Sequence, residues 1–302
     1  MGLWAKASRA RRTGRGILFI GPPQLPEAHF IGTLQHRVSP VKVPRLRTSK
    51  LKQMLNAPEA TELSAPEILV LLEPSISAQE ALKAGFKELI ARRHLHLETT
   101  PPKSKWESER VHLLFNSGHH PQNPVLRGLW GDLRSASRHG SGLNQVLQRL
   151  QREYGPSYEA FKQKIVLPSL LQRGVLQKQT HKALGLFPQT RYLPTPDGTA
   201  LKKQLEQHLS EARRLIPSLA DHKAEATALL LSLGPALLLL PGIESHFQQL
   251  RALTRTDGSE GGFFPVLVVV ASEEPETLER AFHLLNAGFA GDGGSDGDGG
   301  GE

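Results

Sequence analysis

The residues with the clearest chemistry form a short apolar segment between cations. Leu184, Leu186 and Phe187 lie within "ALGLFP", whose glycine and proline favour a turn. Three basic residues flank the segment, namely Lys178, Lys182 and Arg191. Apolar side chains beside cations suit an anionic membrane surface, where each buried side chain contributes about 1.5–3 kcal/mol and each cation about 1 kcal/mol. The sequence alone also allows the three apolar side chains to pack back onto the core.

Catalytic and metal-binding signatures are missing from the chain. It has no GxxxxGK[ST] phosphate loop, no HExxH and no GxSxG, and it has no cysteine. Adjacent His119 and His120 fit a solvated loop better than a metal site, because neighbouring residues rarely ligate one ion well. We therefore expect a non-enzymatic protein that needs no cofactor or metal.

Charge is unevenly distributed along the chain. Residues 1–56 contain eleven Lys and Arg and one acid, a net charge of +10, so the remainder carries about −2 of the total of +8. We predict that residues 1–60 form a basic, mostly irregular segment, that residues 61–287 form the folded domain, and that residues 288–302 form a flexible acidic tail rich in glycine. The basic segment suits a polyanion or serves as a solubilising arm.

The elements that must position the apolar segment are mainly helical, because leucine dominates and β-branched residues are few. Predicted helices are 66–73, 77–92, one around 143–150, one from 161 to 171 kinked at Pro168, and 201–216. Predicted strands are 94–98 and 110–115, and the run 263–272 fits either strand or buried helix. The uncharged run 226–243 predicts two short buried helices joined at Gly234–Pro235 rather than a membrane span.

Two stretches of the chain share one plan. Each stretch predicts a helix, a turn containing arginine and a short strand. The two stretches are residues 86–98, "FKELIARRHLHLE", and residues 167–179, "LPSLLQRGVLQKQ". This similarity predicts two helix–turn–strand units related by pseudo-symmetry, although a leucine-rich chain also produces such echoes by chance.

The order of these segments resembles the Golgi phosphoprotein 3 family. The resemblance rests on "GFKELIARRHLHLE", then "KQKIVLPSLLQRGVLQKQTHKALGLFPQTRYLP", then an amphipathic helix and "ATALLLSLGPALLLL", over roughly residues 63–253. It implies a mainly α fold, a compact helical domain with peripheral β-hairpins. It also implies a cytoplasmic, peripherally associated membrane protein that binds phosphatidylinositol 4-phosphate or a similar anionic phospholipid. Divergent members of this kind occur in bacteria.

The resemblance also implies a headgroup site beside the inserted hairpin. In the better-studied members a Trp and an Arg near the first helix, and two Arg on the helix before the hairpin, hold the headgroup. Here the matching regions offer lysines instead, namely Lys83, Lys87, Lys162 and Lys164. Lysine binds phosphate as a point charge without the bidentate fork of arginine, so we expect weaker lipid selectivity.

Two other classes of function compete with membrane binding. Helix–strand units can resemble winged helices, and the basic segment would then follow the phosphates of a nucleic acid. Alternatively, the apolar tip could be a protein contact, including a contact between copies of a homo-oligomer.

Overall fold

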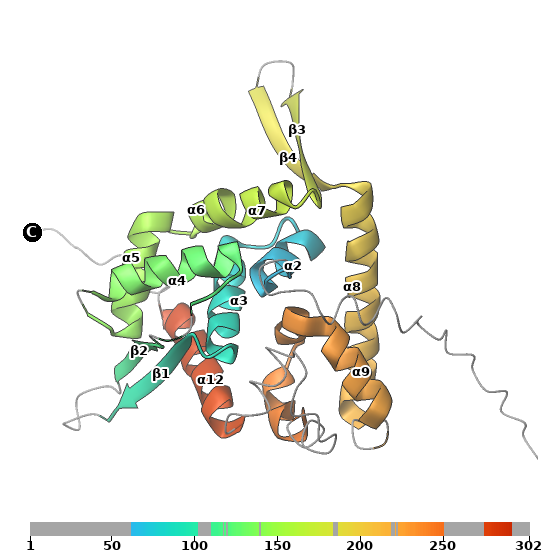
Figure 1. The fold of residues 1–302 in the computed structure, drawn as a ribbon. Helices are drawn as coiled ribbons and strands as arrows, with labels where there is room; N and C mark the ends of the chain where they lie inside the picture. The colour runs from blue at the N-terminus through green and yellow to red at the C-terminus, as the bar shows by residue number, and fades with distance from the viewer. Residues whose placement is uncertain are drawn as a thin grey trace, which may run out of the picture. The chain divides into compact units, whose positions relative to one another are not determined.

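The structure is a computed structural model, and it describes residues 62–101, 110–116, 118, 120–138, 140–183, 187–218, 221, 223–250 and 275–291. Helices and two antiparallel two-stranded sheets make up this part of the chain (Figure 1), so the predicted mainly α fold with β-hairpins is confirmed. The segment 1–60, the tip residues Leu184 and Leu186, and the run 263–272 lie outside the described residues.

The helices and strands follow the chain in this order. The first half contains α2 (Ala65–Leu72), α3 (Ala78–Ala91), β1 (Leu95–Thr100), β2 (Arg110–Phe115), α4 (Pro124–Ser137) and α5 (Leu143–Tyr154). The middle contains α6 (Glu159–Phe161), the π-helical η1 (Lys162–Val166), α7 (Leu167–Gln172), β3 (Leu176–Ala183) and β4 (Phe187–Pro194). The rest contains α8 (Pro196–Leu215), the 3-10 turn η2 (Ile216–Ser218), α9 (Lys223–Leu233), the 3-10 segments η3 (Gly234–Leu239) and η4 (Ile243–His246), and α12 (Pro275–Gly291).

Helix α3 is the centre of the hydrophobic core. Its N-cap is Ser77, whose hydroxyl accepts the Glu80 N–H, and ten of its fourteen residues are buried. It contacts α2, α4, α6, η1, η3, α12 and strand β1. At Gly85, a Cβ would lie 2.6 Å from the side chain of Leu129 on α4, so a glycine is needed where these two helices touch. A helix covered on so many sides has little surface left for a ligand or a nucleic acid.

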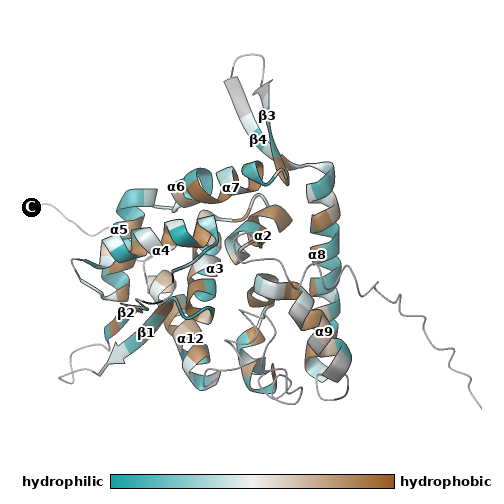
Figure 2. Ribbon diagram, viewed as in Figure 1, coloured by the Kyte–Doolittle hydropathy of each residue, from teal (hydrophilic) through white to brown (hydrophobic). Residues whose placement is uncertain are grey.

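Several predicted helices are confirmed, with shifted ends. The capping box of Ser64 and Glu67 starts α2 as expected, with Pro66 in its first turn. Helix α8 begins at Pro196, five residues before the predicted Leu201, because Thr195 caps it by accepting the Gly198 N–H. Figure 2 shows both hydrophilic and hydrophobic residues along α8, as expected of an amphipathic helix.

Helix α4 was missing from the sequence prediction, which assigned the preceding segment to a loop. Asn123 caps this helix by accepting the N–H groups of Val125 and Leu126 through its side-chain oxygen. Pro124 occupies its first turn. The buried positions Val125, Leu126, Leu129, Trp130 and Leu133 follow helical spacing, so the signal was present in the sequence.

Two boundaries near the C-terminal end differ from the prediction. The second of the two short helices predicted within 226–243 is the 3-10 segment η3, since Gly234 adopts a φ of 50° and Pro235 follows it. The acidic tail was predicted to start at Gly288, but α12 runs to Gly291. Phe289 is buried against Phe86 and Tyr158, and this aromatic contact holds the last helical turn in place.

Candidate membrane-contact site

Strands β3 and β4 form a hairpin that extends away from the helices (Figure 1). They pair antiparallel from Leu176↔Pro194 to Ala183↔Phe187. Leu176 is buried at the base, whereas the next described side chains of β3, Gln177 to Thr180, are exposed. Exposure therefore begins one residue beyond the base of the hairpin, and Gln177 to Thr180 are available for contacts outside the domain.

The register of the hairpin assigns its cations to two faces. Directly paired residues of antiparallel strands share a face, and successive residues alternate. Lys178 therefore occupies one face, while Arg191 and Leu193 occupy the other. The side chains of Lys178 and Arg191 are exposed, and Leu193 is 39% exposed. Each face of the hairpin thus carries at least one residue of positive charge.

A glycine turn connects α7 to the base of the hairpin. Gly174 has a φ of 69°, and its N–H donates to the Leu171 carbonyl while the Val175 N–H donates to the Leu170 carbonyl. This pair of bonds is a Schellman motif, which closes a helix and sets the direction of the chain that follows. The turn therefore fixes the angle at which β3 leaves the helix.

The first turn of α8 supports the other end of the hairpin. The Thr195 hydroxyl donates to the Gly174 carbonyl at 2.7 Å, and the Thr195 N–H donates to the Val175 carbonyl at 3.1 Å. Gly198 packs so closely that a Cβ there would lie 1.9 Å from the Val175 oxygen. Both ends of the hairpin are consequently held by backbone contacts to one another.

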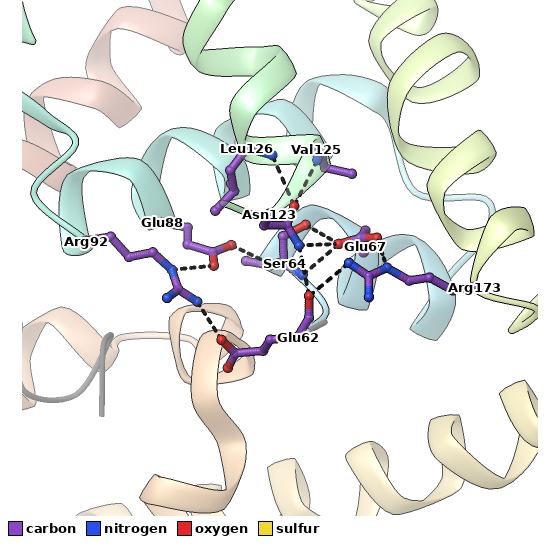
Figure 3. A network of polar contacts seen from close by, with 10 residues as sticks. Glu62, Ser64, Glu67, Glu88, Arg92, Asn123, Val125, Leu126 and Arg173 are labelled. Atoms are coloured by element: carbon purple, nitrogen blue, oxygen red, sulfur yellow. Dashed lines mark hydrogen bonds and ion pairs between the residues drawn. The ribbon is translucent and has the colours of Figure 1, made fainter. Parts of the chain in front are cut away.

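A buried carboxylate ties this corner to the rest of the core (Figure 3). Glu67 has no exposed surface and accepts bonds from the Ser64 N–H and hydroxyl, the Asn123 amide, the Ser169 hydroxyl and Arg173 Nε, at 2.7–3.1 Å. These partners come from the start of α2, the start of α4 and both ends of α7. A buried charge needs such a full set of donors, so the network holds the base of the hairpin against three helices.

The first hairpin begins with the same helix–turn–strand plan, which the echo in the sequence predicted, and it also repeats the buried carboxylate, which the echo did not predict. After α3, the Arg93 N–H donates to the Ile90 carbonyl and the His94 N–H to the Leu89 carbonyl, with Arg93 at a φ of 59°. The C-cap arginine again binds a buried carboxylate, because Arg92 Nε lies 2.9 Å from Glu88 Oε1.

The two C-cap arginines also meet at one residue. Arg92 Nη2 lies 2.9 Å from the Glu62 carboxylate, and Arg173 Nη2 lies 3.1 Å from the Glu62 carbonyl (Figure 3). The two helix–turn–hairpin units are therefore linked through Glu62, three residues before the start of α2.

Burial raises the pKa of Glu88 to about 7, because the carboxyl has no exposed surface. Arg92 and the bond from the Ala65 N–H at 2.6 Å oppose the shift. The folded protein thus holds one buried carboxyl group that titrates near neutral pH.

The helix before the hairpin contains a π-helical segment where α6 passes into α7. The Leu167 N–H donates to the Lys162 carbonyl, five residues back, and Pro168 has no N–H with which to continue the α-helical ladder. The kink predicted at Pro168 therefore takes the form of a π segment. Gln163 and Lys164 in this segment are exposed, and the Tyr192 hydroxyl of β4 lies 3.4 Å from Gln163 Oε1.

Comparison with models of protein families shows to which family the chain belongs. The model of the family described as Golgi phosphoprotein 3 (GPP34) matches residues 84–263, more than half of the 302 residues. The chain belongs to this family. The match includes both Schellman corners and the whole β3–β4 hairpin. A search of curated proteins finds no match to the chain.

Most lysines that the resemblance assigned to a headgroup are already engaged inside the domain. Lys83 pairs with Glu80 at 2.7 Å, and Lys87 pairs with Glu244 at 2.7 Å. These two lysines also lie over the rings of Phe289 and Phe282, respectively. Their charges are therefore compensated by Glu80 of α3 and Glu244 of η4, and each ammonium group also lies over an aromatic ring of α12.

The two lysines of the π segment differ sharply. Lys162 is 7% exposed and donates to the Ile76 carbonyl at 2.7 Å, just before the start of α3, whereas Lys164 is exposed. The bond to Ile76 brings together the two regions that the family resemblance associates with the headgroup. The four lysines predicted for the headgroup nevertheless do not share one open site, because Lys162 donates to the Ile76 carbonyl whereas Lys164 lies at the surface.

Sequence reasoning missed the buried network of Glu67, Glu88, Arg92 and Arg173. Glu67 was recognised only as a capping-box residue, and no pattern pairs it with Arg173, 106 residues away. The signal that could have found it is the shared position of the arginines, each one residue before the turn in the two echoed segments.

Within the described residues no helix combines the length and apolar character needed to cross a bilayer.

Proposed function

We propose that this protein binds anionic membranes peripherally through the β3–β4 hairpin, without catalysing a reaction. The observation that carries the proposal is a projecting hairpin with exposed Lys178 and Arg191 in a member of the Golgi phosphoprotein 3 family. The apolar tip, Leu184, Leu186 and Phe187, would enter the leaflet, and the cations would meet its lipid phosphates. The cytoplasmic face of a membrane is the place where such anionic lipids gather.

Lys164 is the best candidate for headgroup contact among the four predicted lysines. It is exposed on the π segment, next to Gln163, which approaches β4 through Tyr192. Lys162 would contribute only if it left the Ile76 carbonyl, and Lys83 and Lys87 only if they left Glu80 and Glu244. We therefore propose recognition of anionic charge by exposed cations. Selective binding of phosphatidylinositol 4-phosphate would require those internal pairs to open.

The test is co-sedimentation with lipid vesicles. Phosphatidylcholine vesicles containing 20% phosphatidylserine should bind the protein, and neutral vesicles should not. The double variant Leu186→Asp, Phe187→Asp should lose binding to the anionic vesicles. Leu114→Asp is the matched control, because Leu114 is 44% exposed on the other hairpin and its variant should bind as the wild type does. Unchanged binding by the double variant would refute the proposal.

Lipid selectivity needs a second comparison at equal vesicle charge. Vesicles with phosphatidylinositol 4-phosphate should bind no tighter than phosphatidylserine vesicles of the same surface charge if exposed cations act as point charges. A preference that disappears in Lys83→Gln and Lys87→Gln would instead show that the paired lysines form a headgroup site.

Nucleic-acid binding receives less support from the described helices. Helix α3 precedes the first hairpin as a recognition helix would, but its length is covered by other elements. The helix before the second hairpin exposes Lys164 and Gln163 but carries no row of arginine, asparagine and glutamine suited to base edges. A gel shift at low salt that disappears on deletion of residues 1–56 would favour nucleic acid over the membrane.

A further inference from the structure

The exposed face of α4 carries a row of arginines, which we call the α4 arginine stripe (Arg127, Arg134 and Arg138). Spacings of seven and four residues place the three on one side of the helix, and all three are exposed. Gly131 lies between them, and no atom lies within 4 Å of where its Cβ would be. The stripe is thus a continuous cationic surface about 16 Å long, with bare backbone at its centre.

No acid neutralises the stripe among the described residues. Arg127 donates to the carbonyls of Pro121 and Gln122, and Arg134 lies over the Trp130 ring at 5.2 Å. These contacts orient two of the guanidinium groups but leave their charge uncompensated. Asp132 lies on another side of α4, where it accepts the Tyr154 hydroxyl. The stripe therefore has the chemistry to bind a short acidic segment.

The chain itself supplies such a segment directly after α12. Residues 292–302, "DGGSDGDGGGE", contain four acids and no lysine or arginine. Gly288, near the end of α12, packs against Leu143 and Leu147 at the start of α5. Leu143 follows Arg138 by only five residues, which span at most about 18 Å. Eleven extended residues span about 35 Å, so Arg138 and Arg134 lie within reach of the segment.

We infer that the acidic segment 292–302 docks on the α4 arginine stripe. Tethering makes the encounter intramolecular, at an effective concentration in the millimolar range for so short a connection. Docked, the segment covers the cationic face of α4 and removes it from competition for other anions. The consequence for membranes rests on the proposed function: the segment then lowers the attraction of the domain to an anionic leaflet.

The docking can be measured without any membrane, by the distance between two labels. Because the chain has no cysteine, two introduced cysteines are the only labelling sites. Ser135→Cys on the exposed side of α4 and Ser295→Cys in the acidic segment can carry two spin labels. We expect a short, narrow distance distribution at 50 mM NaCl that broadens and lengthens at 500 mM NaCl, since exposed charge pairs are screened by salt.

Two sets of variants decide the interpretation. Replacing all three stripe arginines with glutamine should broaden the distances, whereas Arg213→Gln with Arg214→Gln on the exposed side of α8 should not. Replacing the four tail acids with their amides should have the same effect as the stripe variant, and these substitutions lie beyond the end of α12. Distances unchanged by the stripe and tail variants, or equally changed by the α8 variant, would overturn the inference.

Vesicle binding tests the consequence separately. The tail-amide variant should bind phosphatidylserine vesicles about threefold to tenfold more tightly than the wild type. If docking is observed but vesicle binding is unchanged, the competition is refuted while docking stands. If neither protein binds vesicles, the proposed function fails, and the distance measurement still decides docking.

Discussion

Gly174→Ala tests whether the corner before the hairpin is held by backbone conformation. No atom lies within 4 Å of a Cβ at this position, so the substitution causes no clash. Its cost comes from the φ of 69°, a region that costs a residue with a side chain about 1–2 kcal/mol. Alanine recovers part of this by restricting the unfolded chain, about 0.4–1 kcal/mol. We expect a net loss of about 1 kcal/mol in the free energy of unfolding.

Gly131→Ala is the matched control for this prediction. A Cβ at Gly131 is equally free of neighbours, but the residue lies inside α4 with helical backbone. The same chemical change should there stabilise the protein by about 1 kcal/mol, because alanine is the better helix former. Urea denaturation of the two variants measures both effects. A Gly174→Ala variant as stable as the wild type, alongside a stabilised Gly131→Ala, would refute the account of the corner.

Three further predictions concern charge. Arg173→Leu should lower the free energy of unfolding, measured by chemical denaturation, by about 3 kcal/mol, because it leaves Glu67 buried without its cation. Adding Glu67→Gln should recover part of this loss. If the effects of the two substitutions simply add, the pairing of Arg173 with Glu67 is contradicted. Because the pKa of Glu88 rises to about 7 on folding, the folded state binds more protons than the unfolded state in this range. The free energy of unfolding should therefore fall by about 3 kcal/mol as the pH rises from 4.5 to 7. Glu88→Gln should remove this pH dependence, and a dependence that persists in the variant would exclude Glu88 as its source. The double variant Lys178→Glu, Arg191→Glu should bind phosphatidylserine vesicles at least tenfold more weakly, with an unchanged midpoint of thermal unfolding. The control variant Lys203→Glu, Arg213→Glu on α8 should weaken vesicle binding less.

Much of the fold could be predicted from the sequence because its signals are local. The Ser64 capping box and the apolar spacing of α8 each depend on residues a few positions apart. The echo between residues 86–98 and 167–179 proved informative, since both segments contain the same turn between helix and strand. Their agreement reflects one backbone requirement, a left-handed residue after the helix, met by Arg93 in one unit and by Gly174 in the other.

The candidate site was less predictable because charge compensation acts over long sequence distances. Lys87 is paired with Glu244 across 157 residues, so its availability for a ligand cannot be inferred from neighbouring residues. Lys162 and Lys164 lie two positions apart, yet the π segment buries one and exposes the other. Predicting those outcomes requires the packing of η4 against α3 and the contact of the π segment with Ile76, which local patterns do not encode.

The most direct test of membrane contact places an environment-sensitive fluorophore at the hairpin tip. Leu186→Cys gives a single labelling site in a chain without cysteine, and Ser210→Cys on the exposed side of α8 gives the control. On adding phosphatidylserine vesicles, we expect the emission of the tip label to shift to the blue and to be quenched by lipids brominated in their acyl chains. The α8 label should show neither change. Vesicle binding with no blue shift and no quenching at the tip would contradict insertion of the hairpin.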